Sequence, residues 1–461
     1  MTNFWDYNVW GTVNLVAVLL LSLIVANILK KSVGFLRDSL IPTSVIGGML
    51  LLAISIIYGA VTGKSLFNTE FFGGDGDSVL EIITYHSLAL GFIATIFKPS
   101  REKHSRERNR DIFNTGVTTV SAYLVQAVLG LGITILASLV SDEFFPAAGA
   151  LLPFGYGQGT GQAMNYGSIY ETDYGFVGGK SFGLTIAALG FLSAAIGGVI
   201  HLAILKRRGG YDAGNVNEKK LVLSDIQGED EIPMNGSMDK MSVQLALVLG
   251  TYLGAYLIML GLGTLLPSMR SVLYGFNFLL GVLVASLVKL VMNTLGRKKV
   301  VKKQYINEFL MNRISGFFFD LMIVAGIAAI KIELLEGYWA VILILGIVGA
   351  VSTYFYVRFV CKRLFGKYSE EQFLAMYGML TGTASTGIIL LREIDGEFET
   401  PAAENLVLQN FPAIIFGFPL MFLATFAPKE PLLTLCILVV FFAVMNIILF
   451  RSYIFKRKKT E

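Results

Sequence analysis

Long apolar runs separated by shorter polar segments dominate the pattern along the chain. A helix needs about 20 mostly apolar residues to cross the hydrocarbon core of a bilayer, and eleven runs approach or exceed that length. They cover residues 10–29, 41–58, 79–97, 113–140, 182–205, 241–266, 272–295, 317–332, 338–360, 405–427 and 432–453. We therefore predict an all-α polytopic membrane protein with about eleven transmembrane helices.

Two further apolar segments are interrupted by small and polar residues. Residues 146–171 carry glycine at every second position from Gly155 to Gly161, which disfavours a helix interior. Residues 373–395 contain a Gly-, Ser- and Thr-rich stretch from Thr381 to Gly387. We predict that each segment forms a broken re-entrant hairpin, the first entering the membrane from outside and the second from inside. The alternative is that the small residues only allow helices to pack closely.

The predicted elements follow the same order in the two halves of the chain. Residues 1–208 hold five spans with a hairpin before the fifth, and residues 241–428 hold the same series. Each half crosses the membrane an odd number of times, so the second repeat is inverted relative to the first, as in many secondary transporters. Residues 209–240 are predicted to form a cytoplasmic linker, and residues 429–461 an extra C-terminal span with a basic tail.

The placement of positive charge orients the predicted spans. Lys and Arg cluster after every second span, most densely in residues 98–110, and such clusters lie in the cytoplasm. The N-terminus is then outside and the C-terminus cytoplasmic, in a cell inner (plasma) membrane. Hydrophobic residues make up 54% of the 461 residues and charged residues only 15%. This composition excludes a soluble enzyme and a nucleic-acid-binding protein, which carry more charge.

Polar groups at the two predicted bends form the candidate site. Unwound backbone exposes carbonyl groups, and hydroxyl groups add further oxygen ligands for Na⁺. A helix that restarts after a bend presents its positive N-terminal end, which favours a carboxylate. The candidate solute-binding residues are Tyr156, Gly157, Gln158, Gly159, Thr160, Gly161, Asn165, Gly382, Thr383, Ser385, Thr386 and Arg392. The sodium site is expected near Gly157, Thr160, Thr383 and Thr386, with Ser385 as a further ion-coupling residue. For Gln158 and Asn165, packing hydrogen bonds are the alternative.

Two charged residues have competing interpretations. Asp320 is the ionisable residue placed deepest in a predicted span, which favours a role in ion coupling; the alternative is an ion pair with a basic neighbour such as Arg313. Arg392 follows the second bend and is able to hold a carboxylate through two hydrogen bonds. Its alternative is a salt bridge with Glu393 or Asp395.

Several short segments give the chain a resemblance to the glutamate:sodium symporter (ESS) family over most of residues 20–427. They are Val33-Gly34-Phe35-Leu36, Ile41-Pro42, Val45-Ile46-Gly47-Gly48, Gly157-Gln158-Gly159-Thr160-Gly161 and Tyr174-Gly175-Phe176. The chain departs from the family pattern at Tyr156, where the family has glycine, and in Gly382-Thr383-Ala384-Ser385-Thr386 at the second bend. The resemblance implies a ten-span inverted-repeat core, sodium coupling, a homodimer and an elevator-like movement of the hairpins.

The leading functional prediction is therefore a sodium-coupled symporter of a small anionic amino acid, with glutamate first, or of a dicarboxylate. No cofactor is expected besides Na⁺ as the coupling ion, and no nucleic acid. One alternative is a proton-coupled carrier or cation/proton antiporter of similar architecture. Another is an intramembrane enzyme, which needs a nucleophile with its base or a metal cluster within the spans.

Overall fold

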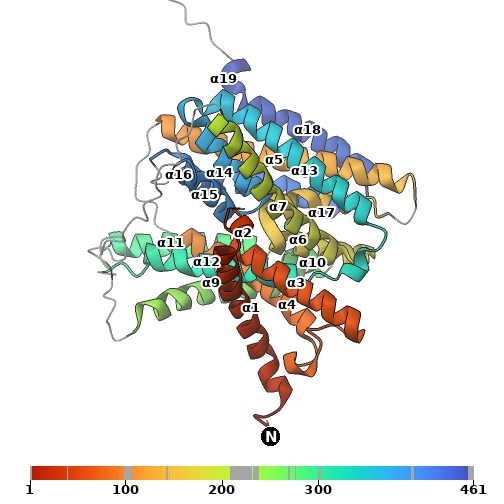
Figure 1. Ribbon diagram of the computed structural model, residues 1–461. Helices are drawn as coiled ribbons and strands as arrows, with labels where there is room; N and C mark the ends of the chain where they lie inside the picture. Colours follow the sequence, from red (N-terminus) through yellow and green to blue (C-terminus); the bar gives the residue numbers. More distant parts are fainter. Residues whose placement is uncertain are drawn as a thin grey trace, which may run out of the picture. The chain divides into compact units, whose positions relative to one another are not determined.

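The computed structural model describes residues 3–38, 40–97, 106–141, 144–207, 231, 238–267, 270–275, 277–298, 303–395 and 399–454. Within these ranges the secondary structure is helical (Figure 1), apart from one isolated bridge between Glu231 and Gln304. Ten described helices are long and apolar enough to cross a membrane, and eleven if one bent pair counts as a single span. The prediction of an all-α polytopic membrane protein is confirmed.

The chain divides by its internal packing into two compact units. Unit 1 comprises Met1–Leu20, Tyr58–Lys103 and Glu218–Gly326, and unit 2 comprises Leu21–Ile57, His104–Asn217 and Ile327–Glu461. Each unit draws on both halves of the sequence. Helices α1 (Tyr7–Ser32) and α3 (Thr43–Thr62) contribute residues to both units.

Unit 1 is built around α4, which packs against α9 and α11. Its buried core includes Leu90, Ile93 and Phe97 of α4 with Val248 of α9 and Met311 of α12. The elements of unit 1 besides α1 and α3 are η1 (Glu70–Phe72), α4 (Gly76–Phe97), α9 (Lys240–Leu265), α10 (Arg270–Gly275), α11 (Asn277–Arg297) and most of α12 (Glu308–Ala328).

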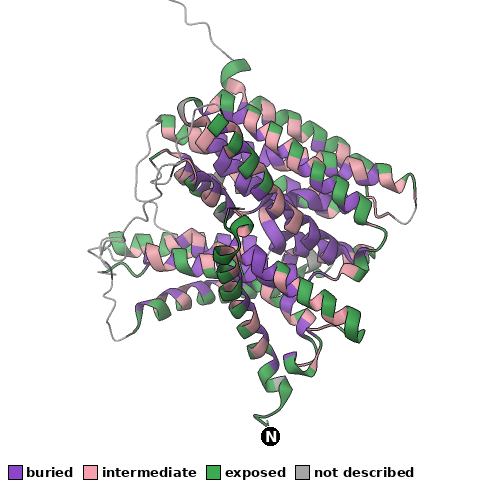
Figure 2. Cartoon of the chain, in the orientation of Figure 1, coloured by how far each residue is buried: buried purple, intermediate pink, exposed green. Residues whose placement is uncertain are grey.

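Unit 2 contains both segments that we predicted to be broken. Buried residues are concentrated along α6, α7 and α14 (Figure 2), whereas α18 exposes Leu432, Val440 and Val444, as suits a helix that faces lipid. Its elements are α2 (Gly34–Asp38), α5 (Arg106–Ser138), η2 (Ala148–Leu151), α6 (Leu152–Tyr174), α7 (Gly179–Arg207), η4 (Ile332–Leu335), α13 (Trp339–Leu364), η5 (Gly366–Tyr368), α14 (Ser369–Thr381), α15 (Ala384–Arg392), α16 (Ala402–Leu408), α17 (Asn410–Phe426), α18 (Pro431–Leu449) and α19 (Arg451–Ile454).

Several observed helices differ from the predicted spans, as three examples show. Helix α12 begins well before Phe317, because the side chain of Asn307 accepts a hydrogen bond of 2.7 Å from the backbone N–H of Leu310 and so caps an earlier turn. The span predicted at residues 272–295 is divided between α10 and α11. The span predicted at residues 405–427 bends by 52° between α16 and Pro412, as expected where proline removes a backbone donor.

Most of the predicted linker, residues 209–240, lies outside the described residues. The described part includes Glu231, whose buried carboxylate accepts hydrogen bonds from Lys240 at 2.8 Å and from Asn307 at 2.6 Å. Asp239 then caps α9 by accepting a hydrogen bond from the backbone N–H of Ser242. The end of this segment therefore packs into unit 1.

Candidate functional site: two broken helical hairpins

The segment formed by η2 and α6, here named hairpin A (residues 148–174), turns back on itself at Gly159. This residue has a φ of 79° and a ψ of −169°, which no α-helix contains and which glycine adopts without steric cost. The rings of Phe154 and Tyr166 stack with centroids 3.9 Å apart. Twelve positions of a straight helix would separate them by about 18 Å. The two arms of hairpin A therefore lie against each other.

The pair α14 and α15, here named hairpin B (residues 369–392), is broken at Gly382 and Thr383, both with non-helical backbone angles. Its arms approach each other at two glycines. A Cβ atom added to Gly378 would lie only 2.7 Å from the Cα of Gly387. This close approach requires glycine at the crossing point, and it places the bend midway between the two residues.

Helix α7 contacts both hairpins near their bends. The hydroxyl of Tyr156 in hairpin A lies 2.9 Å from the Ser193 hydroxyl, and that of Tyr377 in hairpin B donates to the Ser193 carbonyl at 3.0 Å. One turn earlier, a Cβ on Gly190 would meet the carbonyl of Thr381 and the side chain of Tyr156. The two bends are therefore close together in unit 2.

Helix α5 donates hydrogen bonds to a backbone carbonyl close to each bend. The Tyr123 hydroxyl donates to the carbonyl of Gly157 at 3.0 Å. About one turn further on, Gln126 donates to the carbonyl of Leu380 at 2.9 Å and to the hydroxyl of Thr353 in α13 at 2.8 Å. These bonds satisfy backbone carbonyls that an unwound segment leaves without helical partners.

The predicted residues of hairpin A occupy different positions around its bend. Tyr156 is fully buried and its hydroxyl also donates to the carbonyl of Gly346 at 2.6 Å, so it ties the hairpin to α13 and α7. Gly157 presents its carbonyl to Tyr123, and Gly159 forms the bend. The others lie on either side of it: Gln158 is half-buried, and Thr160, Gly161 and Asn165 are buried.

The predicted residues of hairpin B are less clustered. Gly382 and Thr386 are buried at the bend, and the hydroxyls of Thr383 and Thr386 lie 3.4 Å apart. Ser385 lies in the first turn of α15, but its side chain falls outside the described set. Arg392 is the last residue of α15, about 12 Å of helix from Ala384, and it is exposed. The structure does not bring Arg392 to the bend.

Asp320 lies in α12, which belongs to unit 1, and its side chain is exposed. The two hairpins belong to unit 2. The predicted sodium ligands in the hairpins and the predicted ion-coupling carboxylate therefore belong to different compact units.

The first turn of hairpin B is fixed by charge. The Glu370 carboxylate forms an ion pair with Arg358 of α13 and accepts a hydrogen bond of 3.0 Å from Nε2 of the His201 ring in α7. The other ring nitrogen of His201 lies 2.9 Å from the hydroxyl of Tyr354, and the Arg358 guanidinium lies over the ring of Phe373. The end of hairpin B that lies farthest from its bend is thus held to α7 and α13.

One buried residue beside the first bend escaped the sequence prediction. Gln162 is completely buried, and neither atom of its amide group has a hydrogen-bond partner among the residues that the structure describes. A single glutamine in a glycine-rich arm has no pattern that marks it, because its burial depends on helices that are distant in sequence.

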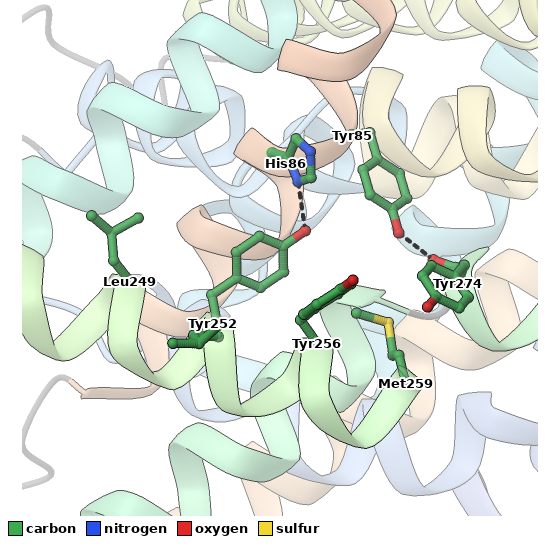
Figure 3. A pocket seen from close by; sticks show the side chains of 8 residues that line it. Tyr85, His86, Leu249, Tyr252, Tyr256, Met259 and Tyr274 are labelled. Atoms are coloured by element: carbon green, nitrogen blue, oxygen red, sulfur yellow. Dashed lines mark hydrogen bonds between the residues drawn. The ribbon is translucent and has the colours of Figure 1, made fainter. Parts of the chain in front are cut away.

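Unit 1 has a separate, mainly apolar pocket of about 320 Å³ (Figure 3). Tyr85, Tyr252, Tyr256 and Tyr274 surround it, and His86 lies at its edge with Nδ1 2.7 Å from the Tyr252 hydroxyl. The Tyr85 hydroxyl donates to the carbonyl of Tyr274 at 2.7 Å. The sequence analysis did not anticipate this aromatic cluster, which α4, α9 and α10 assemble.

A scan of this chain against protein-family models finds no matching family, and a search of curated proteins finds no matching relative.

Proposed function

We propose that this protein is a secondary active transporter, a sodium-coupled symporter that carries a small anionic amino acid such as glutamate. The observation that carries the proposal is the meeting of two broken hairpins on one helix, where Ser193 bonds to Tyr156 of hairpin A and Tyr377 of hairpin B. A bend inside a membrane protein exposes polar backbone, which is tolerated only where protein or a water-filled cavity surrounds it. Two such bends side by side suit a binding site for a polar solute.

The groups at the bends suit an anion and a sodium ion. Helix α15 begins directly after Thr383, and the second arm of hairpin A begins at Thr160. Both helix starts direct backbone N–H groups towards the bend, which favours a carboxylate. The hydroxyls of Thr160, Thr383 and Thr386 with nearby carbonyls supply the hard oxygen ligands that Na⁺ requires.

The order of helices within unit 2 supports an inverted-repeat architecture. Apart from residues 21–57 and the helices after α17, unit 2 takes α5, hairpin A and α7 from the first half of the chain, and α13, hairpin B and the bent pair α16–α17 from the second half. Each series is a helix, a hairpin and a helix. We propose that unit 2 is the part that moves in an elevator-type cycle, and that the protein acts as a homodimer with its C-terminus in the cytoplasm.

The test is uptake of radiolabelled L-glutamate into proteoliposomes that contain the purified protein. An inward sodium gradient should drive accumulation, and collapse of that gradient with a sodium ionophore should abolish it. Uptake driven by a proton gradient without sodium would replace this proposal by the proton-coupled alternative. Absence of uptake for L-glutamate, L-aspartate and dicarboxylates, with folded protein in the vesicles, would refute it.

A further inference from the structure

The amide of Gln162 is unlike the other buried glutamine amides in the described part of the chain. Gln244 is also completely buried, yet its Nε2 donates to the Tyr305 carbonyl at 2.8 Å and its Oε1 accepts from the backbone N–H of Asn307 at 3.0 Å. Gln126 and Gln409 each use their Nε2 and lack a partner only for Oε1. Gln162 alone among these four has neither atom paired. Burying a polar group without a partner is costly, so a group of this kind requires an explanation.

The position of Gln162 follows from the residues that share its helix face. Tyr166, Tyr170 and Tyr174 follow at intervals of four residues, which places all four side chains on one side of the arm. The three hydroxyls donate to the carbonyls of Met421, Ala424 and Thr425 in α17. Gln162 therefore lies on the face turned to α17, one turn closer to the bend at Gly159.

Helix α6 packs against α14 of hairpin B as well as against α17. Gln162 lies three residues past the bend at Gly159. Its amide is therefore buried beside the first bend, on a helix that also contacts hairpin B.

A primary amide offers two different groups side by side. Its N–H₂ group donates and pairs with a carboxylate, while its carbonyl accepts from an ammonium group or ligates a sodium ion. A solute that carries a carboxylate next to a positive charge satisfies both atoms at once. Neither group of the amide is then left unpaired while the solute is bound.

We propose that Gln162 is a specificity-determining residue of the solute site, where Nε2 donates to the carboxylate of the solute and Oε1 faces an adjacent cation. That cation is the ammonium group of the solute or the coupling sodium ion. The inference rests on the proposed function, because it assigns Gln162 to the site between the same two hairpins.

The test compares Gln162→Leu with Gln244→Leu in the purified full-length protein. L-Glutamate binding is measured by thermal shift across a concentration series at fixed sodium, since a ligand that binds the native state raises the melting temperature by mass action. Gln162→Leu should weaken the affinity by about tenfold or more, the usual effect of losing a hydrogen bond to a charged group. Without ligand it should melt at the wild-type temperature or above, because it removes an unpaired buried group. Gln244→Leu should melt lower and bind L-glutamate as the wild type does.

Binding of a second ligand, glutarate, shows whether Oε1 of Gln162 faces the ammonium group of the solute or the sodium ion. Glutarate has the carbon chain of glutamate without the ammonium group. If Oε1 faces the ammonium, Gln162→Leu will weaken glutamate binding more than glutarate binding. If it faces sodium, both will weaken equally and the sodium midpoint will rise.

Two results would distinguish a wrong assignment of Gln162 from a wrong transporter proposal. Wild-type affinity of Gln162→Leu for L-glutamate, with or without a lower melting temperature, would overturn the assignment of Gln162 and leave the transporter proposal standing. If the wild type binds no acidic amino acid or dicarboxylate in sodium, the transporter proposal fails and the role of Gln162 fails with it.

Discussion

Gly378 and Gly387 face each other where the two arms of hairpin B cross, so closely that neither position has room for a side chain. The bend at Gly382 depends on this contact, because the arms would otherwise be pushed apart. A methyl group at Gly378 must move backbone, which is harder than moving a flexible side chain.

We expect Gly378→Ala to lower stability by about 1–3 kcal/mol, the usual effect of overpacking. Gly250 in α9 is the matched control, since a Cβ there meets no atom within 4 Å, and Gly250→Ala should be neutral or slightly stabilising through helix propensity. Thermal unfolding in detergent measures both. Equal melting temperatures for the two variants would contradict the observed crossing.

A double-mutant cycle tests whether Ser193 couples the two hairpins. Tyr156→Phe and Tyr377→Phe each remove a hydroxyl that bonds to Ser193, and each should cost about 1 kcal/mol or more of stability. Because both bonds share one residue, the double variant should differ from the sum by at least about 0.5 kcal/mol. Strict additivity would show that the hairpins are independent.

The sodium prediction concerns the hydroxyls at the bend of hairpin B. Thr386→Ala removes a buried oxygen atom that lies 3.4 Å from the hydroxyl of Thr383, and it should raise the sodium concentration needed for half-maximal uptake. The control is Thr264→Ala in α9, whose exposed hydroxyl bonds only locally to the carbonyl of Gly261. A sodium titration of uptake that is unchanged in Thr386→Ala would remove this residue from the ion site.

The ion pair of Glu370, at the end of hairpin B that lies farthest from the bend, makes the stability of the protein depend on pH. Partial burial alone would raise the pKa of the Glu370 carboxyl, but its hydrogen bonds with the Arg358 guanidinium and the His201 ring outweigh burial and hold that pKa below its ordinary value. A lowered native pKa means that the ion pair contributes stability above the ordinary carboxyl pKa and loses it as the pH falls through the lowered one. Wild-type stability should therefore decline on acidification.

Glu370→Gln removes this contribution and leaves Arg358, which is only 12% exposed, without its charged partner. We expect it to cost about 1–2 kcal/mol at neutral pH, since the pair is partly screened by solvent, and to flatten the acid decline. The control is Glu107→Gln, which removes an ion pair with Arg110 in which both side chains are well exposed. This substitution should change stability little. Melting temperatures measured from neutral to acidic pH give both comparisons, and identical profiles for Glu370→Gln and the wild type would refute the prediction.

Hydropathy and glycine spacing were sufficient to predict the helices and the position of the first bend. The spans could be predicted from the lengths of the apolar runs, because the thickness of a bilayer sets a similar minimum length for each of them. Glycine at every second position left only a small region in which hairpin A could break, and Gly159 lies within it. The α16–α17 bend was missed because proline marks a possible break without fixing which helical turn opens.

The partners of the bends could not be predicted from local pattern. Ser193, Tyr123 and Gln126 form hydrogen bonds to residues next to the bends. They lie on α7 and α5, and the apolar pattern of these helices does not indicate which distant segments they pack against. The bonds of the Tyr156 hydroxyl to Gly346 and Ser193 likewise could not be predicted, because both partners are distant from it in sequence. Such contacts depend on which distant helices pack together, and that information is spread over the whole chain.

The bonds between hairpin A and α17 have a consequence for how the protein is made. The Tyr170 hydroxyl pairs with the carbonyl of Ala424, 254 residues further along the chain. At a synthesis rate of roughly 5–20 residues per second, hairpin A leaves the ribosome about 13–50 seconds before that carbonyl exists. During this interval its tyrosines have no native partner from α17, so the newborn hairpin depends on the insertion machinery, on lipid headgroups or on water until translation ends.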